Sequence, residues 1–204
     1  MANIISMVRV CLAVLVVILL SILDPVVYWA AFFLTLLVIA MDALDGYIAR
    51  RRNEETKLGA VIDILGDRVV EVLYLTTFAF YQWVPLFVPL VVLSRGIITD
   101  GLRAIALRRG FTPFGDQTMM QSRLGRFLVA SRVSRGGYAI LKAAAFSLVI
   151  VSRIPTASDA GSYGWFLVDF IPAAALVCVY GTVILCLIRG IPVILESFRF
   201  FKNA

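Results

Sequence analysis

The sequence contains no histidine and only three cysteines. Without an imidazole, neither general base catalysis nor metal binding can use the side chain that most often serves both roles. Cys11, Cys178 and Cys186 lie inside apolar runs at no metal-ligand spacing. We therefore interpret them as lipid-facing or core-facing residues. Since histidine is absent as well, the chain does not offer the nitrogen and sulfur ligands that zinc prefers.

Charge is also scarce, since charged residues make up 16% of the chain and hydrophobic residues 61%. In an ordinary soluble domain about a quarter of the residues are charged. The sequence therefore predicts one integral membrane domain that extends over residues 1–204. Residues 1–9 lead directly into an apolar run, and no small-residue cleavage site follows, so we expect no cleaved signal peptide.

Apolar runs long enough to cross a bilayer, at ~20 residues each, recur along the chain. Strand alternation is not evident, so the predicted fold is an all-α integral membrane protein with six transmembrane helices. The predicted segments cover residues 4–23, 26–50, 58–82, 84–107, 136–154 and 164–188.

Basic residues give the predicted orientation. They gather at 50–57, at 108–135 and after residue 188, whereas the other connections hold only Arg153. By the positive-inside rule, both termini and the two basic loops face the cytoplasm, as in a bacterial inner membrane. Because these clusters flank spans and lack interleaved aromatic residues, we expect membrane lipids as partners and no nucleic acid.

The stretch "DALDGYIARRRNEETKLGAVIDILGD", residues 42–67, concentrates carboxylates in this apolar chain. At ~100° per residue, Asp42 and Asp45 share one face of the second segment. Asp63 and Asp67, four residues apart, share one face of the third. The short connection makes the two helices antiparallel neighbours, so the four carboxylates can converge, and they would repel one another without a cation between them.

Hard divalent cations suit this ligand set, because Mg²⁺ and Mn²⁺ prefer carboxylate oxygens. Gly46, Ala49, Gly59 and Gly66 leave the same neighbourhood without large side chains. A bulky ligand could therefore approach the backbone. The alternative is that the small residues only allow close helix packing.

The stretch matches the motif D-x-x-D-G-x-x-A-R-(x)8-G-x-x-x-D-x-x-x-D and so resembles the CDP-alcohol phosphatidyltransferase family. All of the fixed positions are present, namely Asp42, Asp45, Gly46, Ala49, Arg50, Gly59, Asp63 and Asp67. The resemblance implies an enzyme that transfers a phosphatidyl group from CDP-diacylglycerol to an alcohol and releases CMP. Homodimers are common in the family. The orientation given by the basic residues places the aspartates, and with them the active site, on the cytoplasmic side.

The resemblance further implies roles for individual residues. Two divalent ions, Mg²⁺ or Mn²⁺, would be held by Asp42, Asp45, Asp63 and Asp67. Asp67, the last of the four, would be the catalytic general base. The nucleotide and its diphosphate would be lined by Gly46, Ala49, Arg50 and Gly59. The planar guanidinium of Arg50 suits phosphate oxygens on physical grounds as well.

The alcohol acceptor is predicted from "SRGIITDGLRAIALRRG", residues 94–110, which resembles the R-E-x-x-x-S-G-L-R stretch of bacterial phosphatidylglycerophosphate synthases. Gly96 replaces the glutamate of that pattern and Asp100 replaces the serine. Cationic residues that could bind a phosphorylated acceptor are Arg95, Arg103, Arg135 and Lys142. Glycerol 3-phosphate is the predicted acceptor, and inositol phosphate, serine or another alcohol could replace it.

Two other classes of protein could also carry carboxylates at bilayer depth. A cation channel or transporter would leave the interleaved small residues and Arg50 without a role. A non-catalytic scaffold would need no fourth carboxylate.

Arg9, in the first segment, is interpreted as an interfacial anchor, and the tryptophans are interpreted as interface and packing residues. The segment 108–126 is either an amphipathic helix or a lid.

Overall fold

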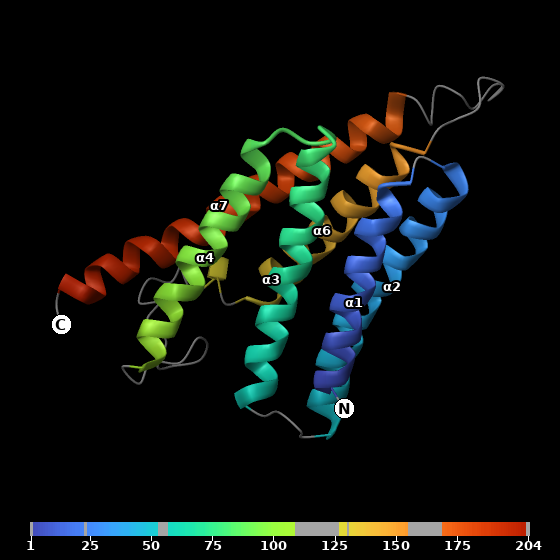
Figure 1. The fold of residues 1–204 in the computed structure, drawn as a ribbon. Coiled ribbons are helices and arrows are strands. Elements are labelled where there is room, and N and C mark those ends of the chain that lie inside the picture. Colours follow the sequence, from blue (N-terminus) through green and yellow to red (C-terminus); the bar gives the residue numbers. More distant parts are fainter. Residues whose placement is uncertain are drawn as a thin grey trace. The chain divides into compact units, whose positions relative to one another are not determined.

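The fold was obtained as a computed structural model, which describes residues 2–22, 24–52, 57–108, 127–129, 131–154 and 169–202. These residues form long helices and no strand (Figure 1). The helices are α1 (Ala2–Leu20), α2 (Pro25–Arg52), α3 (Lys57–Phe80), α4 (Phe87–Arg108), α6 (Arg132–Val151) and α7 (Ile171–Lys202). The prediction of an all-helical fold is therefore confirmed for the described part of the chain.

Each predicted apolar segment corresponds to one of these helices, but the predicted end of the last segment is wrong. α7 continues past residue 188 to Lys202 and includes Pro192. The prediction stopped where the uninterrupted apolar run meets Arg189. A helix extends as far as its backbone hydrogen bonds allow, however, and a charged residue at the end of an apolar run does not interrupt them.

Local signals in the sequence explain two helix boundaries. At the start of α2, the Asp24 carboxylate accepts hydrogen bonds from the backbone N–H groups of Val26 and Val27, at 2.8 and 3.1 Å. Asp24 thus caps the helix, and Pro25 occupies the first helical position, where no N–H is needed. After α3, Gln82 has a φ of 58°, so the chain turns through the left-handed region before α4 begins.

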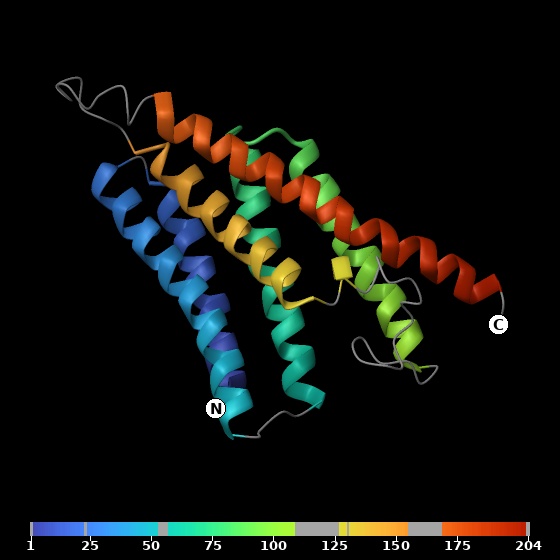
Figure 2. The same ribbon diagram turned by 180° about the vertical axis from the view of Figure 1, so that it is seen from behind.

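The described chain divides into two compact units. The first contains Met1–Leu86 and Ala143–Cys178 and therefore includes α1, α2, α3 and the second half of α6. Within this unit α1 packs against both α2 and α3. α1 and α2 lie side by side in both of the opposite views in Figures 1 and 2.

Aromatic side chains fill the core of the first unit. Tyr74 of α3 is fully buried and stacks on Phe146 of α6, with 5.0 Å between the ring centroids. Its hydroxyl lies 2.9 Å from Thr35 Oγ1 on α2, and Thr35 is also fully buried. Phe78 stacks on Trp83, which confirms that this tryptophan is a packing residue. The Tyr74–Thr35 bond therefore joins α2 and α3 inside an otherwise apolar core.

The second unit contains Phe87–Lys142 and Val179–Ala204, which include α4, the first half of α6 and most of α7. Here Gly190 of α7 gives room to Arg95 of α4, because a Cβ atom on Gly190 would lie 2.7 Å from Arg95 Cγ. Gly181 of α7 likewise lies beneath Leu141 of α6. Small residues on α7 thus allow close helix packing in this unit.

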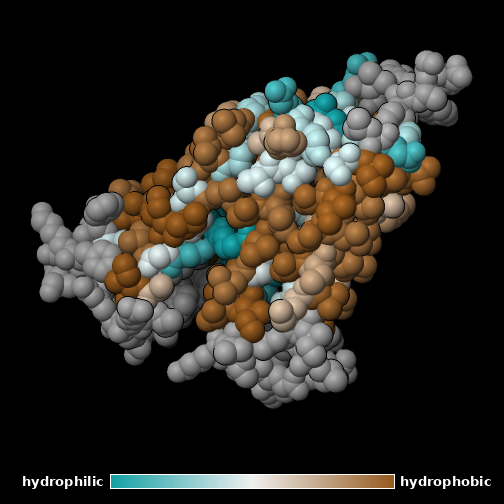
Figure 3. Space-filling model, in the orientation of Figure 1, coloured by the Kyte–Doolittle hydropathy of each residue, from teal (hydrophilic) through white to brown (hydrophobic). Residues whose placement is uncertain are grey.

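Hydrophobic side chains cover much of the described surface visible in Figure 3. Phe33, Phe80 and Ile97 are 61%, 79% and 70% exposed, as expected for side chains that face lipid and not water. By length and composition, three stretches of the described chain can cross a bilayer, within Pro25–Asp42, Phe127–Val151 and Ile171–Ser197. Together with the apolar composition, these stretches identify an integral membrane protein.

Candidate metal centre

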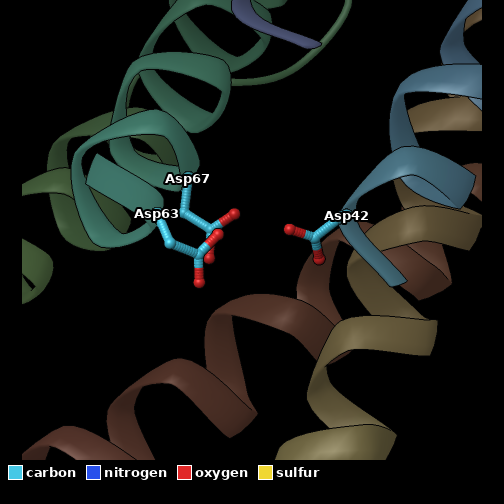
Figure 4. A group of neighbouring side chains, drawn as sticks. All are labelled: Asp42, Asp63 and Asp67. Atoms are coloured by element: carbon cyan, nitrogen blue, oxygen red, sulfur yellow. The ribbon is translucent and has the colours of Figure 1, made fainter. Parts of the chain in front are cut away.

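Three of the predicted aspartates meet in the first unit. Asp42 extends from α2, and Asp63 and Asp67 extend from α3 toward it (Figure 4). One carboxylate oxygen of each lies within 4.8 Å of one from the others. The convergence follows from the sequence, because a spacing of four residues places Asp63 and Asp67 on one face of α3 and the short connection places α2 opposite.

The carboxylates are open on one side of the cluster and closed on the other. The side chains of Asp42, Asp63 and Asp67 are 46%, 48% and 50% exposed. Asp63 Oδ1 is nevertheless buried, so the exposure of this side chain comes from its other atoms. Each aspartate therefore has an outer part that a solute can reach and an inner part that faces the protein.

Arg9 of α1 occupies the inner side of the cluster. Its guanidinium forms an ion pair with Asp42, lies 3.1 Å from Asp67 Oδ1 and lies 3.6 Å from Asp63 Oδ1. The side chain is 1% exposed. The interpretation of Arg9 as an interfacial anchor is therefore wrong. An anchor would extend toward headgroups and water, whereas Arg9 lies inside the protein against the three carboxylates.

Gly66 provides the space for this guanidinium. A Cβ atom at position 66 would lie 3.0 Å from Arg9 Nη2, closer than an ordinary van der Waals contact. Gly66 was predicted to leave room for a ligand beside the aspartates. In the structure it leaves room for an internal cation, and a substrate need not be invoked to explain this glycine.

The donor set fits a hard divalent cation. Three carboxylates from two helices converge within the span of a coordination shell, and they present oxygen atoms only. The guanidinium of Arg9 already places positive charge beside these oxygens. Asp45, the predicted fourth ligand, lies on α2 one turn beyond Asp42, but its side chain is outside the described residues.

The other residues of the motif are placed only by their helices. Gly46, Ala49 and Arg50 lie on α2, and their surroundings are outside the described part of the chain. Gly59 lies in the first turn of α3, one helical turn before Asp63, and is partly buried. The residues of the predicted nucleotide site therefore lie on the same two helices as the aspartates.

All four predicted acceptor residues belong to the second unit. The stem of Arg95 packs on Gly190, and the ammonium of Lys142 lies 5.7 Å from the centre of the Tyr138 ring. Arg135 is exposed on the first turn of α6. Arg103 lies on α4, but its side chain is outside the described residues, as is the segment 109–126.

Sequence reasoning did not identify Arg189 as part of this cationic group. Arg189 is 9% exposed, donates a hydrogen bond to the backbone carbonyl of Ser134 at 2.6 Å and lies 5.4 Å from the Tyr138 ring. Two cations, Arg189 and Lys142, thus contact the same aromatic ring. No local signal could reveal this arrangement, since Arg189 was counted only as a basic residue after the last apolar segment.

Comparisons with known proteins agree with the motif. A sequence profile of the CDP-alcohol phosphatidyltransferase family matches residues 1–188. The chain is similar to two CDP-diacylglycerol–glycerol-3-phosphate 3-phosphatidyltransferases. The first, from Aquifex aeolicus, is 32% identical over 42% of this chain and 49% of that protein. The second, from Cereibacter sphaeroides, is 35% identical over 37% of this chain and 35% of that protein. It is also similar to a CMP-forming cardiolipin synthase from Streptomyces coelicolor, at 33% identity over 42% and 39%.

These matches span half or less of the length of each relative. The family profile, in contrast, extends over most of the chain and includes every position of the aspartate motif. With the convergent carboxylates of α2 and α3, it confirms the resemblance that the motif indicated. The chain belongs to the CDP-alcohol phosphatidyltransferase family.

Proposed function

We propose that the protein transfers a phosphatidyl group from CDP-diacylglycerol to glycerol 3-phosphate and releases CMP. The observation that carries this proposal is the cluster of Asp42, Asp63 and Asp67 in a chain of this family. Relatives from Aquifex aeolicus, Cereibacter sphaeroides and Bacillus subtilis bear the names of enzymes with this pair of substrates, which supports the choice of acceptor.

In the reaction, an oxygen of the acceptor alcohol forms a bond to the phosphorus atom next to the diacylglycerol. The bond from that phosphorus to the oxygen of the CMP phosphate breaks, and the alcohol loses its proton. We assign the proton to the carboxylate of Asp67, which is half-exposed and lies at the end of the aspartate stripe on α3. A carboxylate on the open side of the cluster can meet a hydroxyl that arrives from solution.

Asp42, Asp63, Asp67 and, in this proposal, Asp45 would hold two divalent cations, Mg²⁺ or Mn²⁺. When bound, these ions would neutralise the charge that develops on the diphosphate oxygens. Gly46, Ala49 and Gly59 would leave the neighbouring backbone accessible to the nucleotide, and Arg50 would pair with phosphate oxygens. In this division of roles, the residues on α2 and α3 bind the donor substrate.

The acceptor is assigned to the predicted cationic residues. A doubly charged phosphate needs cationic donors, and the chain supplies Arg95, Arg103, Arg135 and Lys142. The cardiolipin synthase among the relatives favours a lipid alcohol as a second candidate acceptor. Inositol phosphate and serine are further candidates, because each carries a hydroxyl that could attack the same phosphorus atom.

The proposal includes the membrane arrangement. Six spans, cytoplasmic termini and a cytoplasmic active site would keep the lipid tails in the bilayer while CMP and a water-soluble acceptor exchange with the cytosol. A single domain over residues 1–204, location in a bacterial inner membrane and a homodimer also stay predictions. A cysteine placed in the connection at 51–57 should be labelled only from the cytoplasmic side.

A CMP-release assay tests the function. The purified protein would receive CDP-diacylglycerol and Mg²⁺ or Mn²⁺ with one acceptor at a time: glycerol 3-phosphate, inositol phosphate, serine or phosphatidylglycerol. We expect CMP with glycerol 3-phosphate. CMP with another acceptor alone would move the assignment to that alcohol. No CMP with any acceptor, from protein that binds the metal, would favour a scaffold or a transporter.

A further inference from the structure

The cation that the structure places in the aspartate cluster belongs to the protein itself. The guanidinium of Arg9 contacts Asp42 of α2 and both Asp63 and Asp67 of α3, so one side chain of α1 connects this helix to both α2 and α3. A guanidinium carries one positive charge and several donors in a rigid plane, so it can contact several carboxylates at once. Arg9 therefore supplies positive charge to this cluster from within the protein.

The packing of the fold holds Arg9 in its position. The side chain is 1% exposed, and α1 packs against both of the helices that carry the aspartates. Gly66 makes room for the guanidinium, since a Cβ there would lie 3.0 Å from Arg9 Nη2. A flexible surface arginine would need neither this burial nor this glycine. Removing Arg9 would therefore leave the carboxylates close together without their internal positive charge.

Arg9 and a divalent cation interact with the same carboxylates. Arg9 faces their inner side, where Asp63 Oδ1 is buried, and the outer side is about half exposed. A metal can therefore approach from outside while the guanidinium stays in place. Each of the two cations lowers the negative potential that attracts the other, and like charges at such short range repel strongly in a partly buried site.

We propose that Arg9 is an internal counterion that stabilises the metal-free aspartate cluster and lowers its affinity for divalent cations. This proposal rests on the proposed function only in assigning the aspartates to metal binding. Arg9 is in this view a positioning residue: it holds α2 and α3 together before the metal binds, and it keeps metal binding weak enough to be reversible.

Mn²⁺ binding to the purified full-length chain tests the proposal without any turnover. Free Mn²⁺ would be measured by electron paramagnetic resonance, and melting would be followed with and without Mn²⁺. We expect Arg9→Met to bind Mn²⁺ at least about ten-fold more tightly than the wild type, because one positive charge beside the site is removed. The metal-free variant should melt earlier, and Mn²⁺ should raise its melting temperature by more than that of the wild type.

Arg153→Met is the matched control, since it removes the same type of side chain from the same unit. Arg153 is exposed and lies over the Trp83 ring, 6.0 Å from its centre. We expect wild-type Mn²⁺ affinity in this variant. Arg9→Lys should also stay near the wild type in affinity, because it keeps the charge. If Arg9→Met does not fold, Arg9→Gln removes the charge but keeps an amide that can donate to one carboxylate.

An unchanged Mn²⁺ affinity in the neutral variants would overturn the proposal. A weaker affinity would also overturn it, since Arg9 would then assist the metal instead of opposing it. The proposed function fails independently, if wild-type protein binds Mn²⁺ through its aspartates but releases no CMP. If Mn²⁺ binding is insensitive to Asp42→Asn and Asp63→Asn, the cluster is not the metal site and the proposal for Arg9 fails.

Discussion

The buried hydrogen bond between Thr35 and Tyr74 gives a prediction about stability. Removing the acceptor should lower the free energy of unfolding by more than removing the donor. Thr35 Oγ1 donates its only hydrogen to the carbonyl of Ala31, at 2.8 Å. The hydroxyl of Tyr74, 2.9 Å away, must therefore be the donor in the bond between the two side chains. Both residues are fully buried, so neither hydroxyl can turn to water instead.

Tyr74→Phe removes a donor and leaves Thr35 with its bond to Ala31. We expect a loss of about 0.5–1.5 kcal/mol in the free energy of unfolding, which is the net value of one neutral hydrogen bond. Thr35→Val removes the acceptor and leaves the Tyr74 hydroxyl buried without one. That change should cost about 1–3 kcal/mol, because the desolvation of the hydroxyl is no longer compensated.

The double variant Thr35→Val with Tyr74→Phe tests the assignment of the donor, because it removes both hydroxyl groups. It should be more stable than Thr35→Val alone, since no hydroxyl donor is left without an acceptor. Unfolding would be measured by titration with denaturing detergent from a mild detergent. Thr76→Val is the control, because Thr76 is exposed on α3 and its hydroxyl bonds only to backbone carbonyls of its own helix.

Strictly additive losses of stability, or a Tyr74→Phe variant that is less stable than Thr35→Val, would refute the assignment of the donor.

A second measurement links the bond to the aspartate cluster. Thr35 precedes Asp42 by seven residues and Tyr74 follows Asp67 by seven, so the bond lies about two helical turns from the carboxylates on both helices. We expect Thr35→Val to weaken Mn²⁺ binding as well, because the spacing of α2 and α3 is less tightly held.

The remaining predictions concern the reaction. Chelation with EDTA should abolish CMP release, and Mg²⁺ or Mn²⁺ should restore it; activity that survives thorough chelation contradicts a metal-dependent mechanism. Asp67→Asn should reduce turnover by ~100-fold or more while CDP-diacylglycerol still binds, because the proton acceptor is lost; wild-type turnover would exclude Asp67 as the base. Arg103→Ala should raise the KM for glycerol 3-phosphate by roughly ten-fold and leave that for CDP-diacylglycerol nearly unchanged, with Arg103→Lys in between; equal changes in both values would indicate a structural role.

The convergence of the aspartates could be predicted from the sequence because it depends on short-range geometry. Asp63 and Asp67 are four residues apart, and only a short connection separates α3 from Asp42 on α2. The helices themselves follow from apolar runs that are longer than typical strands. Both inferences use periodicity within one helix or one pair of neighbouring helices.

The role of Arg9 could not be predicted in this way, because its partners lie on two other helices. Arg9 and Asp42 are 33 residues apart, and no local pattern shows which face of α1 meets α2 and α3. A basic residue near the start of an apolar helix is typical of an interfacial anchor, and that interpretation was wrong here. Gly66 was the residue in the sequence that indicated a space beside the aspartates. We had assigned this space to a ligand, whereas the side chain of Arg9 fills it.

The aspartate cluster and its counterion are built entirely from consecutive helices at one end of the chain. Arg9, Asp42, Asp63 and Asp67 all lie on α1, α2 and α3. Since synthesis proceeds from the N-terminus, the ribosome has made every one of these groups before it reaches α4. A carboxylate that enters a bilayer alone is costly, and a paired one much less so. Arg9 is thus available to pair with Asp42, Asp63 and Asp67 as soon as α1, α2 and α3 have been made.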